Sequence, residues 1–545
     1  KNGTQIGSAR MGANGFYYTA LPANTFAAGD KLLAWEQGAS TPGGLVALTS
    51  AGHNTGLDYA KNALILTAAS GTLDTAALVT ARGSLPDNIY IPYSVSGSNV
   101  VLGNASVTSL LFRGAGSFAV TDTGANIATL AASNIGSLNF TKSGSLTVGS
   151  VGSVSGITSS GNLTLNTTGT VSQTAPISAS GLELLGTGGT YNLPIASNAV
   201  TTLAGNTGTV NFTNSAGLAI GTVNNTAGLA TSGDLTLNSG GTITQYAPLQ
   251  VVGVATFDAG TGDIVLNKAA NSLRNVTVNS GRDVTLTSAY NGGVTIGLPQ
   301  TAGGLRNVTI DYASAPSVAL YGNGAYFSPY YWDYGERPQP AQLSGNLAVT
   351  SGGTIDHGNY SWLNLTGASS TSTFNSAGDI TLNRGENNLG AVTVNPTLAT
   401  VSANLYNNSS NADLTLSSPI TNLTLAQPNV SFTLLDNKVT GSLYLNNQGG
   451  TVTDNTLTVG AQTLSGSMDL RAESGINPLA PTSVWDVGTT ANFDNTSALT
   501  LNNQIIAGST TTLTAGAGTG DIILNNPANS LRNVTVNSGR DVTLT

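Results

Sequence analysis

Carboxylates and histidines are the side chains in this sequence that would carry ordinary hydrolytic chemistry, and they are few. The chain of 545 residues has 26 Asp and Glu residues, two His residues and no Cys. Glycoside hydrolysis needs two carboxyl groups held roughly 5–10 Å apart. A catalytic zinc ion usually takes three protein ligands. The question is therefore whether these scarce groups gather anywhere.

A Gly-Asp turn motif recurs at the start of expected strands. Its aspartates are Asp234, Asp263, Asp379 and Asp521. An Asp in such a turn commonly hydrogen-bonds to its own backbone. The triplet Gly-Arg-Asp occurs at 281–283 and again at 539–541. A catalytic site is seldom copied unchanged within one chain. We therefore expect turn formation and an exposed ion pair at these positions.

The two histidines stand apart from each other. His53 precedes Asp58 by five residues, and His357 follows Asp356 directly. Two isolated His residues do not make a three-His zinc site, and no Gly-x-Ser-x-Gly nucleophile motif accompanies them. Neither an EF-hand loop nor a Gly-Gly-x-Gly-x-Asp repeat points to calcium. We expect no catalytic residue, no metal and no cofactor.

One segment, 321–341, concentrates aromatic side chains and prolines. Proline cannot donate to a central ladder, so this segment is predicted to be an extruded loop. Tyr and Trp suit surfaces that make apolar and hydrogen-bonded contacts together. The loop would stack sugar rings or pack against a neighbouring fibre, or it folds down over the surface beside it, and the sequence leaves both open. The candidate contact surface consists of Tyr326, Phe327, Tyr330, Tyr331, Trp332 and Tyr334.

The elements that position these residues are expected to be short strands. Charged residues make up 8% of the chain, against about 25% in average proteins. The hydrophobic content of 40% argues against a disordered chain. Val, Leu, Ile and Thr recur in the alternating pattern that is typical of strands. Gly and Asn punctuate the strands, because both tolerate positive φ at tight corners.

Internal repetition decides how the strands are arranged. Residues 262–287 and 520–545 differ at three positions, with an offset of 258. Shorter echoes occur at 161–176 and 233–248, and a looser copy at 378–395. A sandwich also has short strands, but a stack of coils gives each coil a similar environment and so favours repetition. We predict an all-β, right-handed parallel β-helix (β-solenoid) with about 27 coils of about 20 residues.

We divide the chain into four segments. Residues 1–100 are predicted to be a less regular start of the solenoid, and 101–320 to be regular repeats. The aromatic insertion follows at 321–341, and 342–545 contains the remaining repeats. The four segments are expected to form one continuous rod and a fragment of a longer chain.

Charge and hydropathy exclude two classes of partner. The net charge is −9 and no cluster of Lys and Arg occurs, so nucleic-acid binding is not expected. No run of about 18 apolar residues predicts a transmembrane segment. The chain opens at Lys1 without a signal-peptide pattern, so we expect a mature protein or an internal piece.

The text ISASGLELLGTGG at 177–189 lies among SGNLTLNTTGTVSQ, LATSGDLTLNSGGTITQ and SNAVTTLAGNTGTVNF. This pattern resembles the repeat region of filamentous-haemagglutinin-like exoproteins, the large β-helical adhesins of two-partner secretion systems. The resemblance covers residues 100–545, and the family's amino-terminal secretion domain is not visible. It implies export through an outer-membrane barrel, folding outside the cell, and a role as an adhesin, a biofilm-matrix protein or a toxin stalk.

We therefore expect a structural and adhesive extracellular fibre of a bacterial surface or biofilm matrix, and not an enzyme. Its expected partners are the secretion barrel, by resemblance, and polysaccharide or neighbouring fibres. Two alternatives stay open. A polysaccharide-acting β-helix enzyme would need several carboxylate or basic side chains converging in one groove. A passive stalk of a contact-dependent toxin would leave all recognition to another part of the protein.

Overall fold

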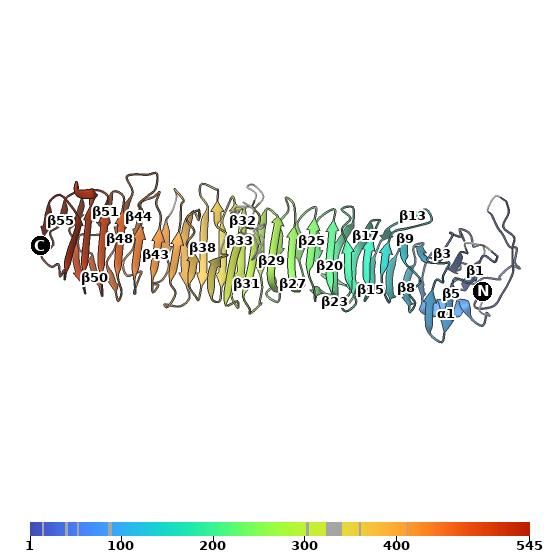
Figure 1. The fold of residues 1–545 in the computed structure, drawn as a ribbon. Coiled ribbons are helices and arrows are strands. Elements are labelled where there is room, and N and C mark those ends of the chain that lie inside the picture. The colour runs from blue at the N-terminus through green and yellow to red at the C-terminus, as the bar shows by residue number, and fades with distance from the viewer. Residues whose placement is uncertain are drawn as a thin grey trace. The chain divides into compact units, whose positions relative to one another are not determined.

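The computed structural model forms two compact units, Lys1–Ala255 and Thr256–Thr545, which are described separately. Within each unit, short strands lie side by side in long ladders (Figure 1). Helix is almost absent from the described residues, with α1 in the first unit and a single 3-10 turn in the second. The described residues are 1–13, 16–38, 42–51, 54–85, 90–300, 305–322, 340–358, 361–410 and 413–545.

The second unit stacks its strands in parallel, each on the strand one coil earlier. One ladder runs through β28 (Ile264–Leu266), β30 (Asp283–Thr287), β32 (Asn307–Tyr312), β35 (Leu347–Ser351), β38 (Thr371–Ser376), β40 (Ala391–Pro396) and β42 (Leu414–Leu416). Another runs through β31 (Val294–Leu298), β33 (Ser317–Gly322), β36 (Thr354–His357), β39 (Ile380–Leu382), β41 (Ala403–Tyr406), β43 (Leu423–Ala426), β45 (Leu443–Asn446), β48 (Met468–Ala472), β51 (Ala491–Asn495), β54 (Thr511–Ala515) and β56 (Val534–Ser538).

Paired residues show that the coils differ in length. Leu423 pairs with Leu443, and Leu443 pairs with Met468, so the second of these coils is longer than the first. The two units together contain about 22 turns. That number is below the expected 27, because many coils carry extra residues at their corners.

Alternation along each strand builds the core. In β28 and β30 the residues Ile264, Leu266, Val284 and Leu286 point inward and are buried, while the residues between them are partly exposed. In-register stacking then aligns apolar side chains along the coil axis, where they exclude water together. One such buried column contains Leu266, Leu286, Ile310, Val349, Phe374 and Val394.

The first unit repeats on a longer period as well. Its parallel ladder includes β9 (Thr129–Ile135), β14 (Ile157–Ser159), β17 (Ile177–Leu185), β19 (Ala199–Thr207) and β24 (Leu229–Thr231). The turn before β14 and the turn before β24 share one geometry. Gly156 and Gly228 have φ of +78° and +83°, and a Cβ on either would lie 2.1 Å from a proline carbonyl oxygen. The echo at 161–176 and 233–248 thus belongs to a three-coil structural repeat.

Two short antiparallel hairpins lie within this repeat region. β12 (Ser150–Val151) pairs with β13 (Val154–Ser155), and β22 (Thr222–Val223) pairs with β23 (Thr226–Ala227). Val151 of the first hairpin packs in a buried cluster with Ala131 of β9. The first hairpin therefore covers part of the face of β9, which would otherwise meet solvent.

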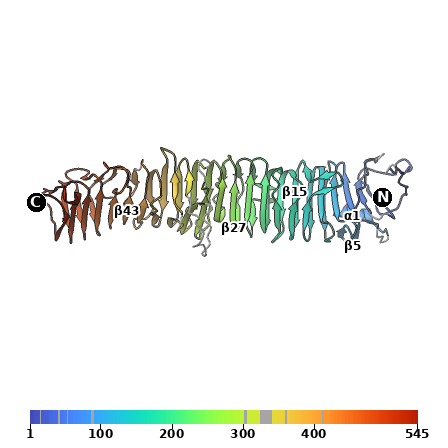
Figure 2. The same ribbon diagram turned by 45° about the horizontal axis from the view of Figure 1, so that its top comes forward.

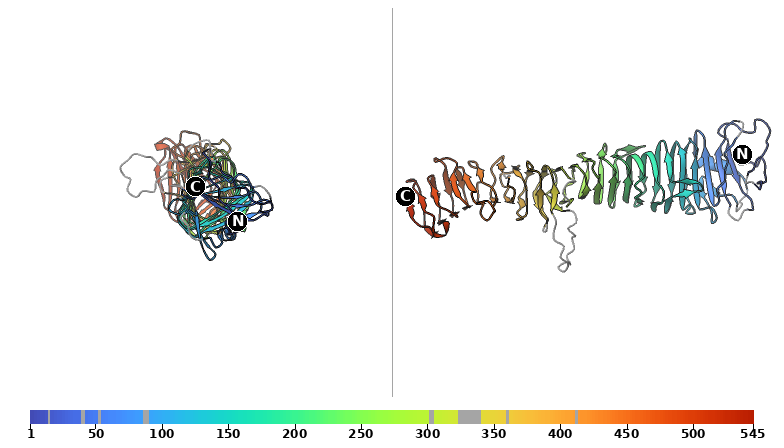
Figure 3. Two further views of the ribbon diagram at one scale, coloured as in Figure 1. Left: turned by 90° about the vertical axis from the view of Figure 1, so that its right-hand side faces the viewer. Right: turned by 90° about the horizontal axis from the view of Figure 1, so that it is seen from above.

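The start of the first unit departs from parallel stacking. β1 (Lys31–Trp35) pairs antiparallel with β2 (Gly44–Leu48), and β2 pairs parallel with β3 (Ala63–Ala68). The helix α1 (Thr75–Arg82) begins after Asp74, whose Oδ1 accepts a hydrogen bond from the Ala77 N–H at 2.7 Å. Figure 2 shows the N terminus and α1 at the same end of this unit, and Figure 3 shows the N terminus among the segments coloured blue.

The β-solenoid prediction is confirmed by these parallel ladders. The proposed extruded loop lies outside the described residues from 323 to 339. The segment boundaries predicted at 100, 320 and 341 stay a prediction, since the structure divides the chain only into its two units.

Candidate functional site

The candidate aromatic surface falls outside the described residues. This applies to Tyr326, Phe327, Tyr330, Tyr331, Trp332 and Tyr334. The strands that flank the segment are described. Ser317 of β33 pairs with Thr354 of β36, and these two partners lie further apart in sequence than the neighbouring pair Leu347 and Ser372. The ladder thus resumes in parallel register beyond the aromatic sequence, whose contact role stays a prediction.

His357 ends β36 beside Asp356, and it is partly buried. Burial lowers the pKa of His357, and the positive charge of Arg384 lowers it further, while the Asp356 carboxylate opposes this. Burial also raises the pKa of Asp356. His53 lies outside the described residues. Among the described residues, no three His, Cys, Asp or Glu side chains are grouped closely enough to hold a metal ion.

The Gly-Asp aspartates connect coils. Asp234 Oδ1 accepts a hydrogen bond from the Val254 N–H at 2.8 Å, and Asp379 Oδ1 accepts one from the Ser402 N–H at 2.8 Å. We expected bonds to each residue's own backbone. The actual donor belongs to the next coil, because stacking places that amide directly beside the carboxylate. These aspartates are therefore part of the scaffold.

The Gly-Arg-Asp triplets form the expected exposed ion pairs. Arg282 donates from Nε and Nη2 to the two carboxylate oxygens of Asp263 at 2.9 and 2.8 Å. Arg540 donates to Asp521 with the same two distances. The Arg540 guanidinium holds the pKa of Asp521 below its usual value. Solvent-exposed pairs of this kind contribute little stability.

A buried carboxylate lies under the second hairpin. Glu183 of β17 is 5% exposed, and its Oε2 accepts hydrogen bonds from Thr164 Oγ1 at 2.5 Å and Asn224 Nδ2 at 2.8 Å. Asn224 also donates to Thr164 and accepts from Asn162 Nδ2 at 2.9 Å. Asn224 has a positive φ of 51° and stands at the hairpin tip. These bonds fasten the hairpin to the strand face, which is a structural role.

A ladder of buried amides follows one corner of the second unit. Asn387, Asn407, Gln427 and Asn447 follow one another at a spacing of one coil and are fully buried. Asn407 Oδ1 accepts from the Leu389 N–H at 2.9 Å, and its Nδ2 donates to the Gly390 carbonyl at 2.8 Å. Asn387 likewise accepts from the Leu363 N–H and donates to the Leu382 carbonyl, so these two amides each satisfy a donor and an acceptor of the buried backbone.

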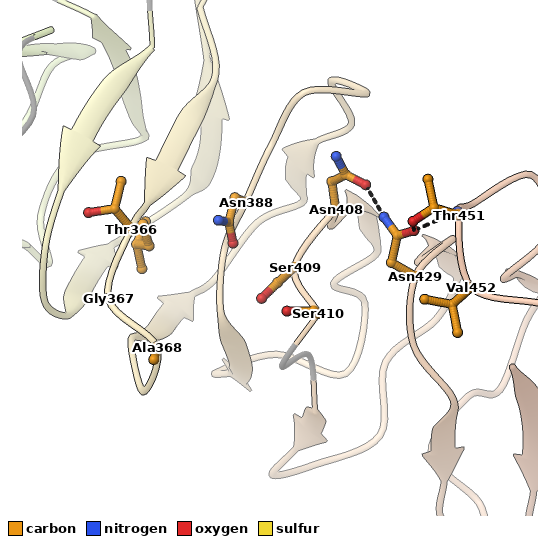
Figure 4. A pocket seen from close by; sticks show the side chains of 11 residues that line it. Thr366, Gly367, Ala368, Asn388, Asn408, Ser409, Ser410, Asn429, Thr451 and Val452 are labelled. Carbon is orange, nitrogen blue, oxygen red and sulfur yellow. Dashed lines mark hydrogen bonds between the residues drawn. The ribbon is translucent and has the colours of Figure 1, made fainter.

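A polar groove lies on the outer side of this corner (Figure 4). Its volume is about 340 Å³. The lining comes from successive segments of the chain, about one coil apart, and none of the lining side chains that the structure describes is charged. It consists of Leu365, Thr366, Gly367, Ala368, Asn388, Asn408, Ser409, Ser410, Asn429, Thr451 and Val452.

Hydrogen bonds hold one wall of this groove. Asn429 Nδ2 donates to Asn408 Oδ1, and Asn429 Oδ1 accepts from the Thr451 N–H at 3.0 Å and from Thr451 Oγ1 at 3.2 Å. In Figure 4 the hydroxyl oxygens of Ser409 and Ser410 point to the side on which Asn388 lies. The groove can accept and donate hydrogen bonds at several points without carrying charge.

Sequence reasoning missed this groove. A signal existed in the Asn-Asn doublets at 387–388 and 407–408, which recur at the same one-coil spacing as the amides that follow. The first residue of each doublet is buried in the ladder and the second lines the groove. A spacing equal to one coil marks a column, but it does not reveal whether the surface there is hollow.

Two parts of the chain match a known repeat family. Residues 205–279 and 339–395 match a family described as "Repeats of unknown function (DUF5649)". The match covers less than half of the chain, and its second part includes the groove residues from Leu365 to Asn388. No curated protein and no solved structure matched the chain. In the described residues, no helix is both long and apolar enough to span a membrane.

The findings agree that this is a repeat protein with a β-helical fold.

Proposed function

We propose that this chain is a structural and adhesive stretch of an extracellular fibre, attaching bacterial cells to one another or to a surface, without catalysis. The supporting observation is the duplicated segment. Residues 262–287 contribute β28 and β30, and residues 520–545 contribute the corresponding strands β55 (Ile522–Leu524) and β57 (Val542–Leu544). Both copies carry the same bidentate Arg–Asp pair. Residues that are reused in this way serve to build coils.

Hydrogen-bonded side chains form rows on the outward faces of the strands. These rows support contact through uncharged groups. Asn395 Nδ2 donates to Asn375 Oδ1 at 2.8 Å, and Asn375 Nδ2 donates to Thr350 Oγ1 at 3.0 Å. Such rows keep the strand face polar although only 8% of the residues are charged. A surface of this kind can bind other polar surfaces without the long-range repulsion that a dense single-sign charge would cause.

The resemblance supplies the finer part of the proposal. By similarity to filamentous-haemagglutinin-like exoproteins, we propose that the chain leaves the cell through an outer-membrane barrel and folds outside. Parallel stacking is compatible with this route, because each coil can settle on the coil before it.

A display experiment tests the adhesive role. The chain is anchored on a bacterium that does not adhere by itself, and attachment to glass and to cultured cells is counted against an unrelated protein displayed at equal density. We expect several-fold more attached or aggregated cells. Attachment equal to the control would contradict adhesion and favour the passive stalk.

A second measurement addresses the enzyme alternative. The purified chain is incubated with alginate and polygalacturonate, and new reducing or unsaturated ends are measured. We expect none above a heat-treated sample. Sustained release of such ends would overturn the non-catalytic part of the proposal.

A further inference from the structure

We infer that the polar groove between Leu365 and Val452 is a binding site for an uncharged, hydroxyl-rich glycan. The inference deepens the proposed adhesive function and rests on it for its biological role. The binding itself can be tested on the purified chain. Its basis is the form of the groove, the chemistry of its lining and its lack of charge.

The form suits an extended polymer. The lining residues Thr366, Asn388, Asn408, Asn429 and Thr451 come one from each successive segment. Neighbouring strands in a ladder lie about 4.8 Å apart. Hydrogen-bonding side chains are thus repeated along the coil axis, and a ligand made of repeating units can meet several of them together.

The lining offers both donors and acceptors. Asn429 uses both ends of its amide within the wall, between Asn408 and Thr451. Asn408 receives that bond on its oxygen, and in Figure 4 its nitrogen points away from Asn429. Sugar hydroxyls both donate and accept, as the hydroxyls of Ser409 and Ser410 do. Amide and hydroxyl groups are the side chains that match them without requiring a charge.

The floor is preorganised. Asn407 and Asn387 fix the turns behind the groove through buried hydrogen bonds to Leu389 and Leu363. Leu365 and Ser409 are themselves buried. Because these groups are already ordered, a ligand does not have to order them on binding, and that lowers the entropic cost.

Charge selects the class of glycan. A sulfated or carboxylated glycan is recognised through Arg and Lys, and the described part of the lining contains neither. The net charge of −9 adds a repulsive background for polyanions. The lining residues within the described ranges include no aromatic side chain either, so they offer no ring stacking to strengthen a single contact. We expect weak individual contacts that become effective when many chains face a polymer.

The test uses dextran and dextran sulfate, which share a backbone and differ in charge. The purified full chain is immobilised densely, and retention of each polymer is measured by surface plasmon resonance. We expect retention of dextran and at least tenfold less dextran sulfate. An array of neutral animal-type oligosaccharides run beside dextran distinguishes a host source from a microbial one. Failure to retain any neutral glycan in either arm overturns the inference, whatever the display experiment gives.

Two variants locate the binding. Ala368→Trp places a large ring in the groove, and Asn408→Ala removes a lining amide. Ala368→Trp should lower neutral-glycan retention at least tenfold, and Asn408→Ala should lower it at least fivefold. Leu435→Trp, at a residue 55% exposed and outside the lining, is the matched control for the ring. Asn537→Ala, at an exposed residue outside the lining whose amide donates one bond to Thr514, is the control for the amide.

Circular dichroism confirms that each variant is folded before binding is compared. Equal retention by Ala368→Trp and Leu435→Trp would place binding elsewhere and overturn the assignment of the groove. If the groove variants still support cell attachment, the inference fails as an account of adhesion while the adhesive function stands.

Discussion

At Gly228 the backbone conformation alone requires a glycine. Its φ of +83° lies in the left-handed region, and an added Cβ would lie 2.1 Å from the Pro248 carbonyl oxygen. The Leu229 N–H donates to that same oxygen at 3.1 Å. The left-handed conformation alone costs a non-Gly residue about 1–2 kcal/mol. We expect Gly228→Ala to cost more than this, because the turn must also open.

Hydrogen exchange at the Leu229 amide measures this effect, since that amide loses its bond when the turn opens. Gly144→Ala is the matched control: φ there is +80°, but no atom lies within 4 Å of the added Cβ, and exchange is followed at the Thr147 amide just after that turn, which donates to the Ala128 carbonyl at 2.8 Å. It should show the conformational cost alone. Equal acceleration of exchange in the two variants would contradict the steric argument.

His357 links stability to pH. Burial lowers its pKa in the folded chain, whereas an unfolded His has a pKa near 6.5. As the pH falls below about 6.5 the unfolded state takes up the proton first. Stability contributed by neutral His357 is therefore present above that pH and lost as the pH falls through the folded pKa. The slope for one proton is at most about 1.4 kcal/mol per pH unit.

The free energy of unfolding, measured by urea titration between pH 7 and pH 5, should fall toward pH 5 in the native chain. His357→Gln should flatten this dependence, and His53→Gln serves as the comparison for the other histidine. Asp356, whose pKa is raised by burial, and Arg384 are left unchanged in both. An unchanged slope in His357→Gln would show that another group titrates there.

At the scale of elements, the strands could be predicted from the sequence, whereas the segments that cover the strands were not predicted. The alternation of Val276 with Val278 and of Val284 with Leu286 is typical of strands, and the structure has β29 at Ser272–Ser280 and β30 at Asp283–Thr287. Alternation alone does not tell which face of 264–266 points inward. Burial of Ile264 and Leu266 settles it, because stacking on Val284 and Leu286 encloses them.

Other elements depend on contacts far apart in the chain. The hairpin β22–β23 reads as a polar turn in sequence, and only its bonds to Thr164 and Glu183 place it on a strand face. The helix α1 could have been read from Asp74 and the small and aliphatic residues that follow it, a usual N-cap signal. The groove has no local signature, because it arises where loops of successive coils meet.

The buried amide ladder predicts which backbone hydrogen bonds at a corner are lost when one of its amides is removed. Asn407 is fully buried and bonds to Leu389, Gly390 and Ser409. Asn407→Ala leaves these backbone groups without partners in a buried place, at about 1–3 kcal/mol for each unsatisfied group. Amide exchange at Leu389 and Ser409 should accelerate at least tenfold. Asn395→Ala, on an outward row, should leave exchange at both amides unchanged. Normal protection in Asn407→Ala would mean that water or another group replaces the side chain.

At the scale of the whole molecule, coils are the units of construction. Each coil in a solenoid contacts mainly its neighbours. In the first unit β14 stacks on β9, with Ile157 beside Ala132, and β17 stacks on β14, with Ile177 beside Ile157. Ile177 thus stands one coil after Ile157. Any two coils with the same register should be able to meet when the coil between them is removed.

Deletion of residues 157–176 tests this property. The cut removes one full coil, so Ile177 can take the place of Ile157 on Ala132 and every later strand keeps a parallel partner. We expect a folded chain, with an unchanged β-sheet signal per residue in circular dichroism and protection from protease similar to that of the parent.

Deletion of residues 157–166 is the matched control, since it removes half a coil at the same place. It brings the following strand to the wrong side of the coil, so polar corner residues such as Thr167 would face positions built for apolar ones. We expect this variant to lose protease protection in the first unit. Because the two deletions share one junction and differ only in phase, equal behaviour would show that coil register does not govern folding. If the full-coil deletion folds and the half-coil deletion does not, the length of the chain can change by whole coils, as a fibre made of repeats requires.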